Sequence, residues 1–522
     1  MRNRILNRPP GLLMTAGLLA LLAAGAEKAY AQVGSDPFRE TKDKIARLIE
    51  DRKIPSLSLA VVREGAIVWE EAFGLADLNK KVKATGETLY PIASVTKPFT
   101  ATGLMILVER GLVDLDKSVN DYLGTGWLRA FEADPSAATV GRLLRHTAGL
   151  PMYWNFDYGG SARRRPPLKM TLGRYGLLVS KPGDSYNYSN LGYAVLESVI
   201  EQVSGRTYSE FMAREVFAPL GLKRTMVATT PEDIPGSAIK YSATLALVPF
   251  CDHDTRGAGS IYATAHDLAR FLLLHLGRLQ PDQKPILNPG SIAAMRTSRD
   301  PDVRSSSYCL GWETGQRCGY SIVTHGGVMD GCRAHLAMIP KEGLAAAVLI
   351  NGEALPSIQV CDWIFAALLP EYARNLNAAP PAAGPPPPPP AFKPPAALVG
   401  TWTGMIKTHE GEIPVRLVVE SASRVELAAL DAEGEPGKAL EPLKTPVVNR
   451  GVFVVHFPQV FSTSDAPAAG HRTVLGLTIR QYRLSGEANL IASDMSYCLP
   501  SYVELKRTDE DPKRSRPQDD IP

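Results

Sequence analysis

The proline-rich run PPAAGPPPPPPAFKPP, residues 380–395, constrains the fold of this chain more than any other segment. Proline lacks the backbone N–H that a helix interior or a central strand requires, so the run favours an extended spacer. It divides the 522-residue chain into a large N-terminal unit and a smaller C-terminal unit. We expect one domain at 32–376, a linker at 377–396, a second domain at 397–507 and a polar tail at 508–522.

The first 31 residues have the pattern of an export signal. Arg2, Arg4 and Arg8 precede the apolar run 11–26, and Ala29-Tyr30-Ala31 supplies small residues at a cleavage site. The run is short for a membrane span, although an uncleaved anchor is the alternative. Cleavage after Ala31 predicts a protein exported to the periplasm or the extracellular space, with no stable membrane span.

The formal net charge of +3 comes from this leader, in which basic residues outnumber acidic ones. The remaining chain is balanced and lacks the basic surface that a nucleic acid partner requires. We therefore do not expect nucleic acid as a partner.

Six cysteines would meet an oxidising compartment after export. Cys309 and Cys318 flank the segment GWETGQR and could form a disulfide across a hairpin turn, and buried free thiols are the alternative. The absence of a Cys-x-x-Cys pair in the sequence argues against a zinc ribbon or a redox centre.

The hydrophobic pattern of the large unit predicts an α+β domain. SLSLAVVREGAIVWEEAFG predicts two strands around Arg63-Glu64-Gly65, and HLAMIP and LAAAVLING predict two more around Lys341-Glu342-Gly343. Between them, apolar residues at helical spacing predict a helix from Ser94 to near Gly111 and another that ends before Gly205. The C-terminal unit instead has short β-rich runs, VRLVVE, GVFVVHF and TVLGLTI, which predict a small antiparallel barrel or sandwich.

The predicted helix after Ser94 carries a nucleophile and a base. A serine hydroxyl needs a neighbouring base, and lysine serves only when its pKa falls well below about 10.4. Lys97 lies on the apolar face of this helix, where burial would lower its pKa. Ser94 stands at the helix N-terminus, where the dipole favours negative charge, and Pro98 fits a first turn.

Spacing alone does not make this pair special, because Ser237 and Lys240 repeat it after Pro235-Gly236. That stretch has no helical periodicity, and we assign it to a surface loop or turn.

Tyr188 and Asn190 provide a second group of polar residues, just before the helix that ends at Gly205. Side chains two apart in an extended segment point the same way, so both could enter one cleft. The alternative is that Asn190 or Ser189 only caps the helix. Tyr153 and Asn155 share the spacing, but no helical pattern follows them.

The third pattern is His325-Gly326-Gly327, at the end of a predicted strand. Glycines there let a ligand backbone approach closely and expose an N–H donor. His275-x-Gly277 and His409-x-Gly411 repeat the pattern, so it gains meaning only from its context.

Taken in this order, Ser94-x-x-Lys97, Tyr188-x-Asn190 and His325-x-Gly327 resemble the serine β-lactamases and penicillin-recognising peptidases. The branch with class C β-lactamases, D,D-carboxypeptidases, D-aminopeptidases and esterases is the most similar, and LLRHTAGLP (143–151) and GAGSIYATAHDLARFL (257–272) are typical of it. The resemblance covers about residues 38–370. It implies a β-lactamase-like fold: an antiparallel sheet flanked by helices, with an all-helical lobe.

The resemblance also implies roles for these residues. Ser94 would be the acylated nucleophile, Lys97 its base and Tyr188 the proton shuttle to the leaving group. Asn190 and His325-Gly326-Gly327 would bind substrate, and the N–H groups of Ser94 and Val328 would form an oxyanion hole. No metal or other cofactor is implied, and we assign CDHDT (251–255) to a loop.

His325 departs from the family pattern, because it replaces the lysine of a Lys-Thr-Gly motif that helps to hold a substrate carboxylate. We therefore expect an exported serine hydrolase acting through an acyl-enzyme intermediate on an ester or amide: a D-amino-acid peptide, peptidoglycan fragments included, a small ester or a β-lactam. The replacement of lysine by His325 favours esterase or peptidase activity over strong β-lactamase activity. His325 could be charged or neutral near neutral pH. His146 in the HTAGL segment is expected to be a structural hydrogen-bonding residue.

Two alternatives belong to other classes of function. The chain could be a non-catalytic cell-wall or peptide receptor that keeps the fold, although the presence of Ser94, Lys97 and Tyr188 together argues against it. The C-terminal unit could also be the main binding module. Its segment LVGTWTG (398–404) resembles the opening strand of lipocalin-like barrels, with no ligand implied.

Overall fold

The computed structural model describes residues 36–508, apart from gaps at 125–126, 159–165, 298, 304–306, 354–356, 379–391, 450, 467–469 and 481. The expected export signal, most of the proline-rich run and all but the first residue of the expected tail lie outside the described residues.

A seven-stranded antiparallel sheet forms the centre of the large domain, in the order β13-β14-β15-β16-β1-β2-β3. Its strands come from both ends of the domain, as expected for an α+β fold. The β1–β2 and β15–β16 hairpins confirm the two hairpins expected from the sequence. The strands are β1 (Ser56–Arg63), β2 (Ala66–Asp77), β3 (Val82–Lys83), β13 (Glu313–Arg317), β14 (Tyr320–Met329), β15 (Cys332–Ile339) and β16 (Leu344–Ile350).

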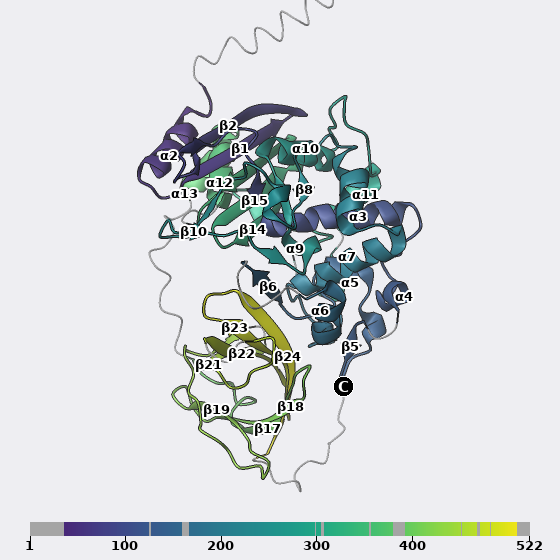
Figure 1. The fold of residues 1–522 in the computed structure, drawn as a ribbon, viewed down its shortest axis with the longest axis vertical. Helices are drawn as coiled ribbons and strands as arrows, with labels where there is room; N and C mark the ends of the chain where they lie inside the picture. The colour runs from purple at the N-terminus through teal and green to yellow at the C-terminus, as the bar shows by residue number, and fades with distance from the viewer. Residues whose placement is uncertain are drawn as a thin grey trace, which may run out of the picture.

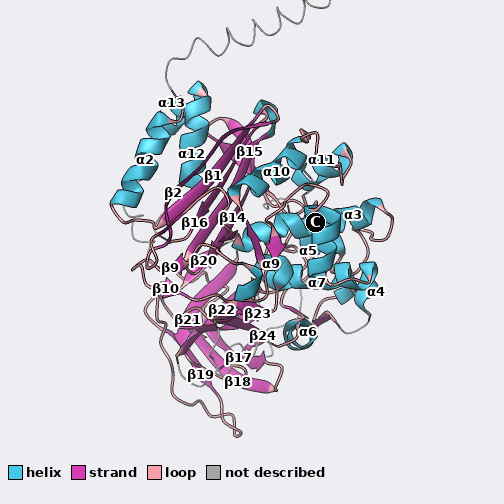
Figure 2. Cartoon of the chain, turned by 45° about the horizontal axis from the view of Figure 1, so that its top comes forward, coloured by secondary structure: helices cyan, strands magenta, loops and turns pink. Residues whose placement is uncertain are grey.

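Both faces of this sheet are covered, because side chains alternate along each strand. On β1, Ala60 and Val62 join the core that contains helix α10 (Ala265–Leu276). Leu59 and Val61 join a second core under the helices α2 (Arg39–Glu50), α12 (Ser357–Leu368) and α13 (Pro370–Ala378). Figure 2 shows these helices on the opposite side of the sheet from α10. The sheet is therefore a rigid support for residues at its edge.

A helical lobe lies beside the sheet. Its central helix α3 (Thr96–Glu109) is buried from Thr96 to Leu107, and Phe99 stacks on Phe271 of α10 with ring centroids 3.7 Å apart. The other helices of the large domain are α4 (Asn120–Leu123), α5 (Val140–Leu144), α6 (Leu168–Tyr175), α7 (Asn190–Ser204), α8 (Tyr208–Met212), α9 (Arg256–Gly259) and α11 (Pro289–Thr297). Its short strands are β4 (Tyr90–Pro91), β5 (Arg129–Ala130), β7 (Leu177–Leu178), β8 (Met226–Val227), β9 (Lys240–Tyr241), β10 (Leu247–Val248) and β12 (Ile261–Ala263).

The C-terminal unit is a curled antiparallel sheet, in the order β19-β18-β17-β24-β23-β22-β21-β20. Buried and part-buried residues alternate along β21, so Phe453, Val455 and Phe457 fill its interior. We call this unit the C-terminal sheet. Its strands are β17 (Gly400–Lys407), β18 (Glu412–Val419), β19 (Val425–Ala429), β20 (Val447–Asn449), β21 (Val452–Pro458), β22 (His471–Arg480), β23 (Arg483–Ala492) and β24 (Tyr497–Arg507).

A short strand of the large domain extends the C-terminal sheet. Strand β6 (Trp154–Asp157) pairs with the start of β24 and also with β11 (Asp252–His253). Figure 1 shows β6 between the C-terminal sheet and the helical lobe. The two units are therefore joined by backbone hydrogen bonds as well as by the chain.

The expected Cys309–Cys318 disulfide is wrong, because both cysteines are free thiols. The last five residues of GWETGQR form β13; Cys318 directly follows this strand and Cys309 lies four residues before it, so the strand separates the two cysteines. A strand of this length spans about 17 Å, far beyond the reach of a disulfide.

Candidate active site

Ser94 lies at the junction of the sheet and the helical lobe. It is the middle residue of a 3₁₀ turn, Ala93–Val95, that leads directly into α3. Ala93 has a φ of 47°, in the left-handed region that is costly for a residue with a Cβ. A backbone hydrogen bond next to Ala93 helps to stabilise this conformation, because Ile92 donates its N–H to the carbonyl of Ile261, 3.0 Å away. Strain of this kind clusters at functional sites.

Lys97 lies one turn after Ser94, and its side chain is fully buried. Its Nζ donates to Ser94 Oγ at 3.1 Å, to Asn190 Oδ1 at 2.8 Å and to the carbonyl of Ala258 at 3.1 Å. None of these acceptors carries a formal charge, and burial lowers the pKa of Lys97 well below 10.5. The expected contact between Ser94 and Lys97 is therefore present, with the lysine biased toward the neutral amine.

Tyr188 lies on the other side of Lys97, whose Nζ is 4.7 Å from the centre of the tyrosine ring. Burial raises the pKa of Tyr188 far above 10, and a hydrogen bond with Ser94 opposes that increase only in part. The phenol is therefore neutral at ordinary pH and holds its proton more tightly than Lys97 does. Of the two side chains, Lys97 is the better suited to accept a proton and Tyr188 to donate one.

Ser189, and not Asn190, caps the helix α7. Its Oγ accepts from the N–H of Gly192 at 3.0 Å and donates to the carbonyl of Pro151 at 2.7 Å. The Asn190 side chain is thus available to Lys97, and its Nδ2 donates to the carbonyl of Tyr153 at 2.9 Å. Ser189 is therefore the helix cap, and the side chain of Asn190 contacts Lys97.

His325 is 1% exposed on β14, and both of its ring nitrogens have partners within the chain. Nδ1 lies 2.9 Å from the carbonyl of Gly326 and must donate, so Nε2 accepts from the Tyr308 hydroxyl at 2.8 Å. Burial lowers the pKa of His325 to about 3. The histidine is therefore neutral near pH 7, and its ring joins Tyr308 to the backbone of β14.

The glycines of β14 allow this strand to approach the nucleophile. A Cβ at Gly327 would lie 2.2 Å from the carbonyl oxygen of Ile92, two residues before Ser94. Only glycine permits that distance. The next residue, Val328, is 66% exposed and lines the same pocket as Ser94. The expected oxyanion pair, Ser94 and Val328, therefore lies on two segments in close contact.

A pocket of about 570 Å³ opens beside Ser94. It lies between the helical lobe, the edge of β14 and the tip of the β23–β24 hairpin. Its wall contains the expected site residues Ser94, Tyr188, Asn190, His325, Gly326 and Val328. The other lining residues are Met152, Trp154, Phe156, Glu313, Met329, Asp330, Arg333, His335, Glu353 and Met495.

Comparison with known proteins identifies the family. The beta-lactamase family model matches residues 41–369, which is more than half of the chain. The chain belongs to this family. Its match to the unguisins hydrolase ungD' of Aspergillus campestris is 29% identical and covers 60% of this chain and 62% of that protein. Its match to penicillin-binding protein 4 of Amycolatopsis lactamdurans is 28% identical and covers 60% of this chain and 84% of that protein. The first of these matches spans less than two thirds of the relative's own length.

Solved structures extend the likeness of this beta-lactamase family member to its C-terminal sheet. The octameric penicillin-binding protein homologue from Pyrococcus abyssi covers 90% of the chain, with a TM-score of 0.54 and 22% identity. The structure of SurE with D-Leu also covers 90%, with a TM-score of 0.58 and 23% identity. A mutant of a class C beta-lactamase covers 65% of the chain, with a TM-score of 0.55 and 18% identity. At these identities the comparison shows the fold alone.

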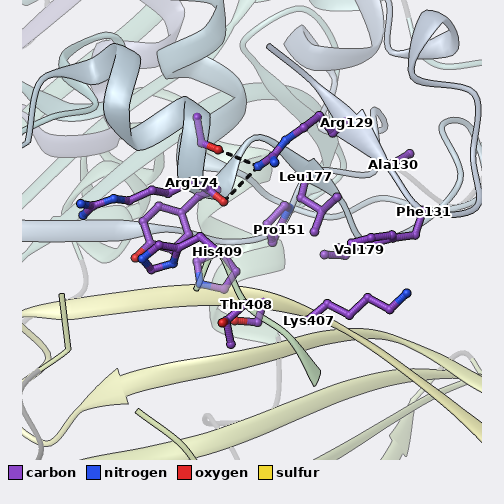
Figure 3. Close-up of a pocket in the computed structure, with 14 residues that line it drawn as sticks. Arg129, Ala130, Phe131, Pro151, Arg174, Leu177, Val179, Lys407, Thr408 and His409 are labelled. Carbon is purple, nitrogen blue, oxygen red and sulfur yellow. Dashed lines mark hydrogen bonds between the residues drawn. The ribbon is translucent and has the colours of Figure 1, made fainter. Parts of the chain in front are cut away.

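A second cavity, of about 560 Å³, lies between the helical lobe and the C-terminal sheet (Figure 3). Arg129 faces it, and its guanidinium donates to the carbonyls of Gly173 and Arg174 at 2.6 and 3.4 Å. Lys407, on the opposite wall, lies 4.1 Å from the centre of the Phe131 ring. None of the described residues that line this cavity belongs to the site expected from the sequence, so we do not take it as the catalytic site.

The structure also places three other residues that the sequence analysis considered: His146, Lys240 and Tyr153. His146 accepts a hydrogen bond from the N–H of Ser189 at its Nδ1, 3.0 Å away, which confirms a structural role. The surface assignment of Lys240 is wrong: it is 3% exposed on β9, with its Nζ 3.5 Å from Cys251 Sγ. Tyr153 uses its hydroxyl to donate to Asp254 at 2.6 Å and does not reach Lys97 with it.

Within the described residues, no group of three or more His, Cys, Asp or Glu side chains is arranged to hold a metal ion. Among the same residues, every helix is too short or too polar to cross a membrane.

Sequence reasoning missed three contributors to the site. Ala258 acts through its carbonyl, and any residue type could supply that group. Tyr308 fixes His325 from a segment without a motif. Met495 belongs to the C-terminal sheet, and only the pairing of β6 with β24 brings it to the pocket.

Proposed function

We propose that this chain is an exported serine hydrolase that cleaves an ester or amide through an acyl-enzyme intermediate on Ser94. One observation carries the proposal. Lys97 Nζ, fully buried, lies 3.1 Å from Ser94 Oγ, and burial lowers its pKa. A neutral amine at that distance is the base that a serine nucleophile needs.

In the acylation half of the reaction, Lys97 takes the proton of the Ser94 hydroxyl as Oγ attacks the carbonyl carbon of the substrate. The N–H groups of Ser94 and Val328 are suited to hold the negative charge on the carbonyl oxygen. As the bond to the leaving group breaks, Tyr188 donates its proton to that group. The proton on Lys97 then restores the Tyr188 hydroxyl, and the Oγ–acyl bond remains.

In the deacylation half, a water molecule attacks the acyl carbon and gives one proton to the pair formed by Lys97 and Tyr188. The bond between Oγ and the acyl carbon breaks, Oγ regains a proton, and the acid leaves. Asn190 holds Lys97 in place through its Oδ1, 2.8 Å away, so the base keeps its position through both halves. The enzyme therefore ends each cycle with the protons it began with.

The candidate substrates are D-amino-acid peptides, small esters and β-lactams. One relative of similar fold, SurE, has been solved with D-Leu, which supports a D-amino-acid group in the substrate. The buried neutral His325 offers no fixed positive charge for a substrate carboxylate, which argues against efficient β-lactam turnover.

The decisive experiment uses an alkyl fluorophosphonate and a labelled penicillin on the purified chain. Ser94 in the wild type should gain the phosphonate mass, located by peptide mapping, and Ser94→Ala should gain none. Ser237→Ala is the matched control, because it removes the serine of the other Ser-x-x-Lys pair and should label like the wild type. Labelling by penicillin as well would add β-lactams to the substrates.

An unlabelled wild type that also turns over no short-chain ester would overturn the catalytic proposal and favour a receptor that keeps the fold. Export is tested separately by N-terminal sequencing of the chain recovered from an expressing bacterium. We expect a new terminus after Ala31, and recovery of the full leader would contradict export.

A further inference from the structure

The wall of the pocket beside Ser94 carries more acid than base. Among the described residues that line it, Glu313, Asp330 and Glu353 are carboxylic acids, and Arg333 is the one guanidinium. The pocket also has two histidines, but burial lowers the pKa of His325 to about 3 and that of His335 to about 4. Neither adds positive charge near neutral pH, so the lining is net negative.

The three carboxylates differ in what they already bind. Asp330 accepts a hydrogen bond from the Tyr158 hydroxyl at 2.6 Å, and Glu353 accepts from the N–H of Gly331 at 2.7 Å. The Glu313 side chain makes no hydrogen bond or ion pair with any described residue, although it is only partly exposed. A part-buried carboxylate without a partner is costly, and a bound cation would offset that cost.

Glu313 lies close to the residues of the proposed catalytic site. It lies at the start of β13, paired with Thr324 of β14, one residue before His325. Its charge contributes to the raised pKa of Tyr188. A group held by Glu313 would therefore lie within the reach of a small substrate attached to Ser94.

Aromatic side chains line the same pocket. Trp154, Phe156 and Tyr188 present rings to it, and Met152 and Met495 add thioethers. A cation is attracted to the face of an aromatic ring, and aromatic rings beside a carboxylate are a recurrent environment for ammonium ligands. Carboxylate and rings together select against an anion and in favour of an organic cation.

We propose that this pocket selects substrates that carry an ammonium group, held by Glu313 and the aromatic wall. The inference rests on the proposed hydrolase function and names its substrate class. A primary amine and a quaternary ammonium share the chemistry that the pocket recognises, and the experiment separates them.

The test compares kcat/KM within matched pairs of substrates that differ only in charge. Butyrylcholine and its carbon isostere, in which a quaternary carbon replaces nitrogen, place the cation in the leaving alcohol. The p-nitrophenyl ester of trimethylammonio-butanoic acid and its carbon isostere place it in the acyl group. D-alanine p-nitroanilide and D-lactic acid p-nitroanilide test a primary amine.

In at least one pair, the wild type should prefer the cationic member by about tenfold. Glu313→Gln should reduce that ratio to about one, because a change in turnover that is common to both members of a pair cancels in the ratio. Glu441→Gln, which removes an exposed carboxylate of the C-terminal sheet, is the matched control and should keep the wild-type ratio.

Ratios near one in all three pairs, or a preference that Glu313→Gln leaves intact, would overturn the inference. Tetramethylammonium tests it without a variant: it should inhibit turnover of the neutral esters competitively, and sodium chloride at equal ionic strength should not. The same inhibition by both salts would also contradict it. Failure of the proposed function is a different result, in which the wild type turns over neither member of any pair faster than Ser94→Ala.

Discussion

The indole Nε1 of Trp154 donates to the carbonyl oxygen of Met495 at 2.7 Å, and this bond joins the two domains at the edge of the catalytic pocket. It is reinforced by the adjacent backbone pairing, where Asn155 lies opposite Tyr497 and the N–H of Phe156 donates to the carbonyl of Ser496. Trp154 and Met495 both line the pocket beside Ser94. The C-terminal sheet is therefore part of the wall of that pocket.

The first prediction concerns Met495→Gly. Met495 has a φ of 60°, which glycine adopts without steric cost, so the free energy of unfolding should change by less than about 1 kcal/mol. The substrate, however, loses the thioether as a contact. We expect KM to rise about fivefold with kcat nearly unchanged, the effect of about 1 kcal/mol of lost apolar contact. Steady-state kinetics and thermal unfolding check both parts.

Leu245→Gly is the control for this change. Leu245 has a φ of 61° in the β9–β10 loop and does not line the pocket. It should alter neither KM nor kcat. A Met495→Gly enzyme with unchanged KM for every substrate would show that the hairpin tip does not contact the bound molecule.

The second prediction compares two neighbouring glycines of β14. A Cβ at Gly327 would lie 2.2 Å from the Ile92 carbonyl oxygen, so Gly327→Ala must separate β14 from the Ser94 segment. A misplaced oxyanion donor costs about 100-fold or more in kcat. At Gly326 the nearest atom to an added Cβ is 3.4 Å away, an ordinary contact. Gly326→Ala should therefore stay within a few-fold of the wild type.

The measurement is kcat/KM well below the melting temperature of each variant, so that loss of fold is separated from loss of geometry. Equal activities for the two alanine variants would mean that the contact between β14 and Ile92 does not set the position of the oxyanion donors.

The sequence was sufficient for residues that are close in the chain or carry a clear periodicity. Ser94 and Lys97 meet because they lie one helical turn apart, and the apolar stripe of α3 predicts the burial of Lys97. The β1–β2 and β15–β16 hairpins follow from apolar, β-rich runs with a glycine at each turn between them. These features depend on local geometry, which the spacing of residues expresses directly.

Longer-range features could not be found in this way. Met495 reaches the pocket through a strand pairing between domains, and nothing in its local sequence marks it. Lys240 looks like a loop residue because β9 has only two residues, too few to show a period. GWETGQR looks like a turn because of its two glycines, but Gly315 lies inside β13 and only Gly311, with a φ of 83°, precedes the strand. In each case a tertiary contact, absent from the local pattern, decides the outcome.

The third prediction concerns the protonation of His325. With its pKa lowered to about 3, it stays neutral across the range in which an ordinary histidine titrates. The pH profile of kcat/KM should therefore have the same shape between about pH 5 and pH 8 in the wild type and in His325→Gln. The value of kcat/KM should fall by less than about tenfold in His325→Gln, because glutamine can still bind the Tyr308 hydroxyl. An inflection in this range that disappears in His325→Gln would show that the histidine takes on a charge.

The fourth prediction tests whether Lys97 is neutral, through the pH dependence of stability. Its pKa is lowered in the folded protein, so between that lowered pKa and 10.5 the unfolded chain binds the additional proton. Stability rises with pH wherever the unfolded state binds more protons, by up to about 1.4 kcal/mol per pH unit for one group. The free energy of unfolding of the wild type, minus that of Lys97→Met, should therefore increase as the pH rises from about 7 toward 10. Urea unfolding of both proteins at several pH values measures the difference.

Lys341→Met, in the exposed β15–β16 turn, is the reference for effects of pH on the rest of the molecule. The difference in free energy of unfolding between the wild type and Lys97→Met should increase with pH. The difference between the wild type and Lys341→Met should not. A difference between the wild type and Lys97→Met that stays constant from neutral to alkaline pH would mean that the buried amine is charged in the folded protein. A charged amine cannot accept the Ser94 proton, so this result would remove the base from the proposed mechanism and leave Ser94 without an activating group.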